Sequence, residues 1–119
     1  MSIVRRKPEV PVDFKQMFGG AGEAEMHKIL VGAEEMMGKG RLFNHMFLKP
    51  GAEVGWHVHK GDCETYYILK GKGEYSDNGT MIEVFPGDMT FVGDGEGHSI
   101  KAVGDETLEF IALILFTVK

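Results

Sequence analysis

Glycine recurs at short, regular distances through the second half of the chain, and this rhythm most constrains the fold. Turn signals fall at steps of eight to ten residues, at Gly51, Gly61, Gly71, Gly79, Gly87, Gly95 and Gly104. The pair Asn78-Gly79 is also a strong hairpin signal, because both residue types tolerate positive φ. Steps of this length are typical of short antiparallel strands in a sandwich or barrel. We therefore predict an all-β fold.

The segments between these turns have the composition of strands. Residues 65–69 are β-branched and aromatic, and residues 41–48 are mostly apolar. Residues 108–118 form a nearly continuous apolar run, which predicts either a strand buried on both faces or one that pairs with another chain. Residues 24–31 fit a strand or two turns of helix, and we prefer the strand because the rest of the chain is β.

A chain of 119 residues is long enough for one domain with a single core. We treat residues 24–119 as one barrel domain and residues 1–23 as an N-terminal arm, which is a candidate for a dimer interface. Pro8 and Pro11 favour an extended backbone within the arm, and Asp13 is a candidate cap for a short turn. Residues 32–40 are interpreted as a loop.

Composition and charge exclude several classes of partner. The net charge is −5, which gives no support to nucleic-acid binding. The single cysteine, Cys63, excludes an intrachain disulfide and suits a reducing compartment. The first residues lack the apolar region of a signal peptide, and no apolar stretch approaches eighteen residues. We expect a cytoplasmic protein without a membrane partner.

Two histidines and a glutamate between glycines are the strongest chemical signal in the sequence. If residues 54–59 form a strand, His57 and His59 point to the same face, with Cα atoms about 6.6–6.8 Å apart. That separation allows both imidazoles to reach one metal ion. Glu64 follows a turn and begins the next strand, so a hairpin brings it back beside the histidines. This set is an incomplete metal shell that needs at least one further ligand.

These residues resemble the first motif of the cupins, in the spacing Gly51-x5-His57-x-His59-x4-Glu64-x6-Gly71. A second stretch, Gly87-x5-Gly93-x-Gly95-x2-His98, resembles the second cupin motif. It departs from that pattern at Gly93, where cupins carry proline, and at Ala102, where they carry asparagine. The resemblance covers less than half of the chain.

The resemblance implies a cupin-type jelly-roll barrel with His98 as the missing ligand. The site would then hold one divalent transition metal ion through His57, His59, Glu64 and His98. Nitrogen and carboxylate ligands suit Fe, Mn, Ni, Co, Cu or Zn and do not choose among them. The alternative is a hydrogen-bonded polar cluster without metal. Because the loop before His98 lacks the proline, we expect His98 to be the most weakly constrained ligand.

Two further residues are candidates for a catalytic role. Tyr66 shares the inward face with Glu64, where it either donates a hydrogen bond to a ligand or fills the barrel. His45 lies one strand before the two histidines and is either a proton relay or a histidine at the sheet surface. Cys63 is expected on the face opposite Glu64, as a small inert residue rather than a sulfur ligand.

The preferred function is that of a metal-dependent enzyme acting on a small organic molecule, of the oxygenase, isomerase or decarboxylase type. The alternatives are a binding or sensing module without turnover and a structural barrel with a vestigial site. Only three arginines occur, none in the motif strands, which weighs against a sugar-phosphate substrate. We expect a homodimer, with residues 1–18 and 108–118 at its interface.

Overall fold

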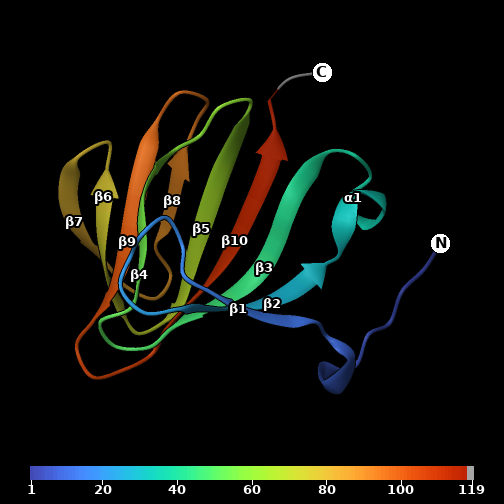
Figure 1. Cartoon of the computed structure of the whole chain (residues 1–119), viewed down its shortest axis with the longest axis horizontal. Helices are drawn as coiled ribbons and strands as arrows, with labels where there is room; N and C mark the ends of the chain where they lie inside the picture. Colours follow the sequence, from blue (N-terminus) through green and yellow to red (C-terminus); the bar gives the residue numbers. More distant parts are fainter. Residues whose placement is uncertain (118–119) are drawn as a thin grey trace.

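The computed structural model describes residues 1–117, which contain ten strands and two very short helices (Figure 1). The strands are β1 (Val12–Lys15), β2 (Ala24–Leu30), β3 (Gly40–Leu48), β4 (Glu53–Val58), β5 (Asp62–Lys70), β6 (Lys72–Asp77), β7 (Thr80–Val84), β8 (Met89–Val92), β9 (Gly97–Val103) and β10 (Leu108–Phe116). The helices are the 3₁₀ turn Lys7–Glu9 and α1 (Gly32–Glu35). No helix in residues 1–117 is long and apolar enough to cross a membrane.

The strands form two antiparallel sheets that pack face to face. One sheet has the order β1-β2-β3-β10-β5-β8 and the other the order β4-β9-β6-β7. The side chains between the sheets form one apolar core, which includes Leu48, Ile68, Tyr75, Ile100, Leu108 and Phe110. This architecture confirms the predicted all-β jelly-roll fold.

Strand alternation decides which side chains enter the barrel. In β5, Glu64, Tyr66 and Ile68 are buried, whereas the alternating residues Tyr67 and Leu69 are exposed. The glycines that separate the strands adopt positive φ at the predicted turns, for example Gly61 and Gly71. The predicted inward face of this strand is therefore confirmed.

The apolar run near the end of the chain forms β10, which lies inside its sheet. It pairs with β3 on one side and β5 on the other, so it has no free edge for a second chain. Its inward residues are buried and its outward residues Ile111 and Leu113 are half-buried. Val118, the last residue of the predicted run, lies outside the described residues.

The N-terminal region contains more β-strand than the sequence indicated, because part of the predicted arm forms β1. Residues 24–30 form β2, which confirms the strand interpretation, and α1 occupies the start of the predicted loop. Asp13 does not cap a turn: it lies in β1, opposite Met26 of β2. The loop after β1 then crosses over β4, with an isolated bridge between Met17 and Val54 (Figure 1).

Candidate metal centre

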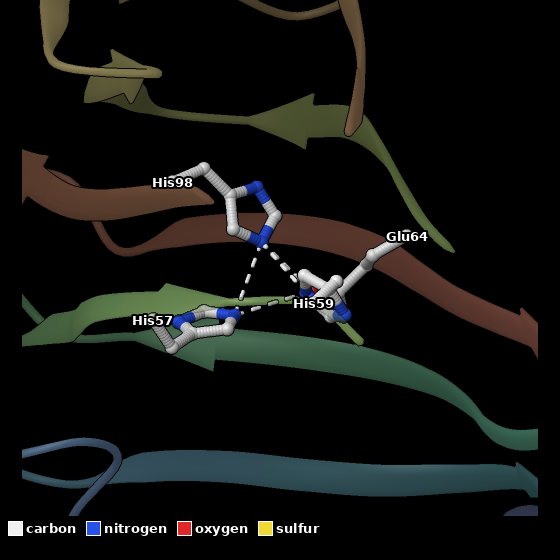
Figure 2. A group of neighbouring side chains, drawn as sticks. All are labelled: His57, His59, Glu64 and His98. Carbon is white, nitrogen blue, oxygen red and sulfur yellow. Dashed lines mark hydrogen bonds and ion pairs between the residues drawn. The ribbon is translucent and has the colours of Figure 1, made fainter. Parts of the chain in front are cut away.

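The four predicted ligands come from three strands of the two sheets and converge between them (Figure 2). His57 lies on β4, directly opposite His98 of β9 in the smaller sheet. His59 follows the end of β4, and Glu64 lies near the start of β5 in the larger sheet. The hairpin turn between β4 and β5 thus places Glu64 beside the two histidines, as the sequence predicted.

The ligand atoms of these residues all lie within 4.8 Å of one another. The Nε2 atom of His98 lies 3.1 Å from that of His57, 3.3 Å from that of His59 and 2.9 Å from Oε1 of Glu64. The same carboxylate oxygen is 3.1 Å from Nε2 of His59 and 3.6 Å from Nε2 of His57. Nitrogen and oxygen ligands about 2.0–2.2 Å from one ion are separated from each other by distances of this size.

Each imidazole is oriented by a hydrogen bond from its other nitrogen. Nδ1 of His57 donates to the backbone carbonyl of Gly55 at 2.8 Å, and Nδ1 of His59 donates to Oδ1 of Asp62 at 2.7 Å. Nδ1 of His98 lies 2.7 Å from the hydroxyl of Tyr75. A carbonyl and a carboxylate only accept, so the proton stays on Nδ1 and Nε2 presents a lone pair to the centre.

This orientation favours a metal site over a simple polar cluster. With protons on the outer nitrogens of His57 and His59, two acceptor nitrogens face the same carboxylate oxygen of Glu64, at 3.6 and 3.1 Å, whereas the tautomer of His98 depends on whether the Tyr75 hydroxyl donates or accepts. Close contacts between acceptors repel, and burial makes the repulsion more costly. A cation at the centre of the cluster provides the missing partner for these atoms. The donor set therefore fits a divalent transition metal.

The electrostatics of the centre favour an ionised Glu64 and a neutral His98, and they act in the opposite sense on His59. Burial would raise the pKa of Glu64, but hydrogen bonds from His57, His59 and His98 outweigh it and hold this pKa well below its usual range. Burial lowers the pKa of His98, which keeps its ring neutral. The hydrogen bond to Glu64 instead raises the pKa of His59, against the effect of burial.

Of the two candidate catalytic residues, the structure brings Tyr66 to the cluster and leaves His45 apart from it. The Tyr66 ring is buried and stacks on His98, with centroids 4.8 Å apart and planes at 17°. His45 points to the outer side of β3, where Nε2 lies 3.1 Å from Oε1 of Glu109, while its neighbour Met46 faces inward. Successive side chains of a strand alternate, so His45 cannot share the inward face with Met46.

The loop that precedes His98 is held more firmly than the missing proline suggested. The amide of Gly95 donates to the carbonyl of His59 at 2.7 Å, and the amide of His59 donates to the carbonyl of Glu96 at 2.9 Å. The Glu96 carboxylate also accepts from the amide of Gly93 at 2.7 Å. His98 itself has no exposed surface. The expected weak constraint on His98 therefore does not match the structure.

Sequence reasoning missed several residues that complete the site. Asp62 accepts from His59 and also from Nε of Arg41, at 2.8 Å, although Arg41 lies outside the motif strands. Hydrogen bonds from Arg41 and His59 lower the pKa of Asp62, overcoming the opposite effect of burial. Tyr75 supports His98 from β6. Only the position of Asp62, three residues after His59, offered a signal in the sequence.

A small cavity of about 40 Å³ opens onto three of the four ligands, His57, His59 and Glu64. Apart from the site residues it is lined by Met17, Phe18, Arg41, Leu42, Met46, Val54, Tyr66, Ala112 and Ile114. Two larger open grooves, of about 640 and 860 Å³, contain none of the four ligands and lie against β1, β2 and β3. The small cavity is the candidate functional site because His57, His59 and Glu64 line it.

Fold and site together define a small jelly-roll barrel with one candidate metal centre. Residues 44–114 match the family described as the Cupin domain, and the chain belongs to the cupin family. It is 44% identical over 113 residues to an oxalate-binding protein of Thermotoga maritima, covering 95% of this chain and 93% of that protein.

Solved structures agree with this assignment. A crystal structure of a predicted oxalate decarboxylase from Thermotoga maritima has a TM-score of 0.89 and 43% identity, covering 96% of this chain and 99% of the other. The polyketide cyclase RemF from Streptomyces resistomycificus has a TM-score of 0.75 at 19% identity, covering 100% and 87% of the two chains. The second likeness reflects the fold alone.

Proposed function

We propose that this chain binds oxalate, or a carboxylate of similar size, at a divalent metal ion held by His57, His59, Glu64 and His98. The observation that supports the proposal is the small cavity lined by three of these four residues, His57, His59 and Glu64. The similarity to an oxalate-binding protein over 95% of the chain supports the same ligand class. The bound ion would supply a Lewis-acidic position for carboxylate oxygens.

The size of the cavity limits what can reach the ion. A water molecule needs roughly 10–15 Å³ of such space, so a cavity of about 40 Å³ admits only a few water-sized groups. A two-carbon dicarboxylate is among the smallest organic acids and comes nearest to that size, whereas a sugar phosphate is several times larger. Apolar side chains, including Leu42, Met46 and Val54, form most of the wall and provide few partners for a polyhydroxylated ligand.

The charge of the cavity also suits a small anion. Arg41 contributes a guanidinium to the lining, and its Nε is already fixed by Asp62. About half of the Arg41 side chain remains exposed, which leaves further N–H groups for a carboxylate. We assign Arg41 to ligand attraction at the cavity, with the ion as the principal binding partner.

Binding without turnover fits the lining better than the enzyme that the sequence favoured. Decarboxylation of oxalate to formate and carbon dioxide consumes one proton, so the site must supply a donor. Among the described residues of the lining, the titratable groups besides the four ligands are Arg41 and Tyr66. Burial and then the Glu64 charge raise the pKa of Tyr66 well above its usual value. Neither group releases a proton readily near neutral pH.

Decarboxylation is the second candidate, because a structure 43% identical to this chain is described as a predicted oxalate decarboxylase. Formate production from oxalate by the metal-loaded protein distinguishes the two candidates. Tyr66 would then be the residue to test as a catalytic group, since it is the non-ligand hydroxyl in the cavity lining. Absence of formate together with saturable oxalate binding supports the binding function.

Isothermal calorimetry of metal-loaded protein with oxalate tests the proposal. The expected result is saturable binding at about one oxalate per ion, with weaker binding of the longer malonate and succinate. The matched control is the His57→Ala/His59→Ala double variant, which lacks the ion and is expected to bind no oxalate. Equal oxalate binding by wild type and double variant, or none by metal-loaded wild type, contradicts the proposal.

We also propose that two copies associate as a homodimer. Exposed apolar side chains of β5, β8 and β10 share the outer face of the larger sheet: Tyr67, Leu69, Met89, Phe91 and Leu115. Burial of such a face by a second copy would shield apolar surface from water. Light scattering at micromolar concentration should give the dimer mass for wild type and a lower mass for Phe91→Glu. A wild-type monomer contradicts this proposal.

A further inference from the structure

One part of the cavity wall is an aromatic ring from the N-terminal arm. Phe18 lies in the loop after β1, and its ring stacks on the ring of His57 with centroids 4.1 Å apart and planes at 12°. The same side chain lines the cavity above the ligands, yet 56% of its surface is exposed. One side of the ring therefore faces the site while much of the rest faces solvent.

The fold holds this loop against β4 at close range. The carbonyl of Met17 accepts from the amides of Gly20 and Gly55, each at 3.0 Å. A Cβ atom at Gly55 would collide with the carbonyl of Phe18, and one at Gly20 would collide with the carbonyl of Glu53. The two backbones approach this closely only because both positions are glycine. The approach places the Phe18 ring over His57.

The backbone conformation of Phe18 supports a specific role for its side chain. Phe18 has φ of 52°, in the left-handed region that bulky residues rarely adopt. Such a conformation persists where the surrounding contacts determine it, and it is common at ligand clamps and switch regions. Here the surrounding contacts are the glycine-mediated approach to β4 and the stack on His57.

Within residues 1–117, His57 is the most exposed of the four ligands. His98, His59 and Glu64 are less exposed than His57, at 0%, 2% and 4% against 9%. An incoming carboxylate or a departing ion therefore meets least protein on the His57 side. The Phe18 ring stands on that side.

We propose that Phe18 is the gate of the cavity and a determinant of ligand size. Its ring must move for an ion or a carboxylate to pass, and its resting position leaves room for a two-carbon dicarboxylate but not for a longer one. The claim that Phe18 limits ligand size rests on the proposed function. The claim that Phe18 controls metal exchange rests only on the four-residue cluster.

Three variants test the gate. Phe18→Ala removes the ring, Phe18→Trp restores a flat aromatic side chain, and Phe14→Ala is the matched control. Phe14 belongs to the same arm, is similarly exposed and lines an outer groove instead of the cavity. Thermal unfolding establishes that each variant is folded. Where Phe18→Ala fails to fold, Phe18→Leu replaces it, since leucine keeps apolar bulk without the flat ring.

The first measurement is the rate at which excess chromophoric chelator removes Zn²⁺ from the loaded protein. Removal of a gate is expected to speed release by about tenfold or more, with Phe14→Ala and Phe18→Trp close to wild type. In the metal-free protein, the ring protons of His57 should also shift in NMR spectra when the stacked ring is lost. The gate is overturned if Phe18→Ala, or Phe18→Leu in its place, releases Zn²⁺ at the wild-type rate.

The second measurement compares the dissociation constants for oxalate and malonate. The preference for oxalate is expected to narrow by about tenfold in Phe18→Ala and to persist in Phe14→Ala. Faster metal release without carboxylate binding in any variant supports the gate and overturns the proposed function. A different result overturns the gate and leaves the proposed function intact: wild type binds oxalate, but Phe18→Ala releases Zn²⁺ at the wild-type rate and keeps the wild-type preference for oxalate over malonate.

Discussion

His98 and His57 lie opposite each other on neighbouring strands, and the surroundings of these two ligands, called here the two walls of the candidate metal centre, differ. On one wall, His98 has no exposed surface, its Nδ1 meets the hydroxyl of Tyr75, and Tyr66 stacks on its ring. On the other, His57 is held by a backbone carbonyl, and the largely exposed ring of Phe18 covers it. Two residues with the same ligating chemistry are thus held differently, and in our proposal the first wall fixes the geometry of the site while the second admits ligands.

The largest effect is expected when both histidines of the motif are removed. His57→Ala/His59→Ala leaves one imidazole and one carboxylate, too few donors to retain a transition metal ion. Metal analysis should find less than about a tenth of wild-type content, given the loss of half the ligands. The matched control is His27→Ala/His45→Ala, a second histidine pair that lies across neighbouring strands on the outer face. Equal loss in both double variants would place the site elsewhere.

Single substitutions compare the two walls directly. His98→Ala should lower metal affinity at least as much as His57→Ala, because His98 is the fully buried ligand and the Tyr75 hydroxyl already orients its ring. This order is opposite to the one that the sequence suggested. Competition titration with a chelator measures both affinities. A clearly smaller loss of metal affinity in His98→Ala than in His57→Ala would show that the buried wall contributes less to metal binding than the exposed wall.

Removal of the Tyr75 hydroxyl weakens the rigid wall without removing a ligand. Tyr75→Phe should lower metal affinity by about 10–100-fold, the usual effect of losing a hydrogen bond that orients a metal-binding histidine. The control is Tyr67→Phe, a tyrosine of β5 that points outward. The same chelator titration applies. Unchanged affinity in Tyr75→Phe would mean that packing alone orients His98.

The smallest effect is expected at Gly93, where the second motif lacks its proline. Gly93→Pro removes the amide that donates to the Glu96 carboxylate, in a loop already fixed by backbone bonds to His59. We expect metal affinity within about twofold of wild type and a loss of stability of about 1 kcal/mol. Chemical denaturation and chelator titration measure the two quantities. Markedly tighter metal binding would restore the earlier expectation of a loose loop.

The sequence predicted the parts of the site that depend on local rules. Alternation along a strand placed His57 and His59 on one face, and the hairpin brought Glu64 beside them. The prediction of His98 as a ligand depended on the resemblance to cupins. His98 lies far along the chain from the other three ligands, and spacing alone does not predict that its strand pairs with β4. These four residues were correctly brought together.

The remaining contacts depend on how the two sheets and the arm pack, which no spacing encodes. Tyr75 reaches His98 from β6, and Phe18 reaches His57 across the sheet from the arm. The inward face of residues 41–48 was also ambiguous, because apolar residues occupy both faces of that strand. This ambiguity left the orientation of His45 open in the sequence.

The metal content of protein purified without added metal tests the central claim most directly. Elemental analysis at neutral pH should give about one transition metal ion per chain. Dialysis to about pH 4–5 should release it, because protons compete for three imidazole nitrogens, whereas the low pKa of Glu64 keeps that carboxylate ionised. The account would be contradicted if the purified protein held much less than one ion per chain and if added Fe, Mn, Ni, Co, Cu or Zn did not raise this content to one.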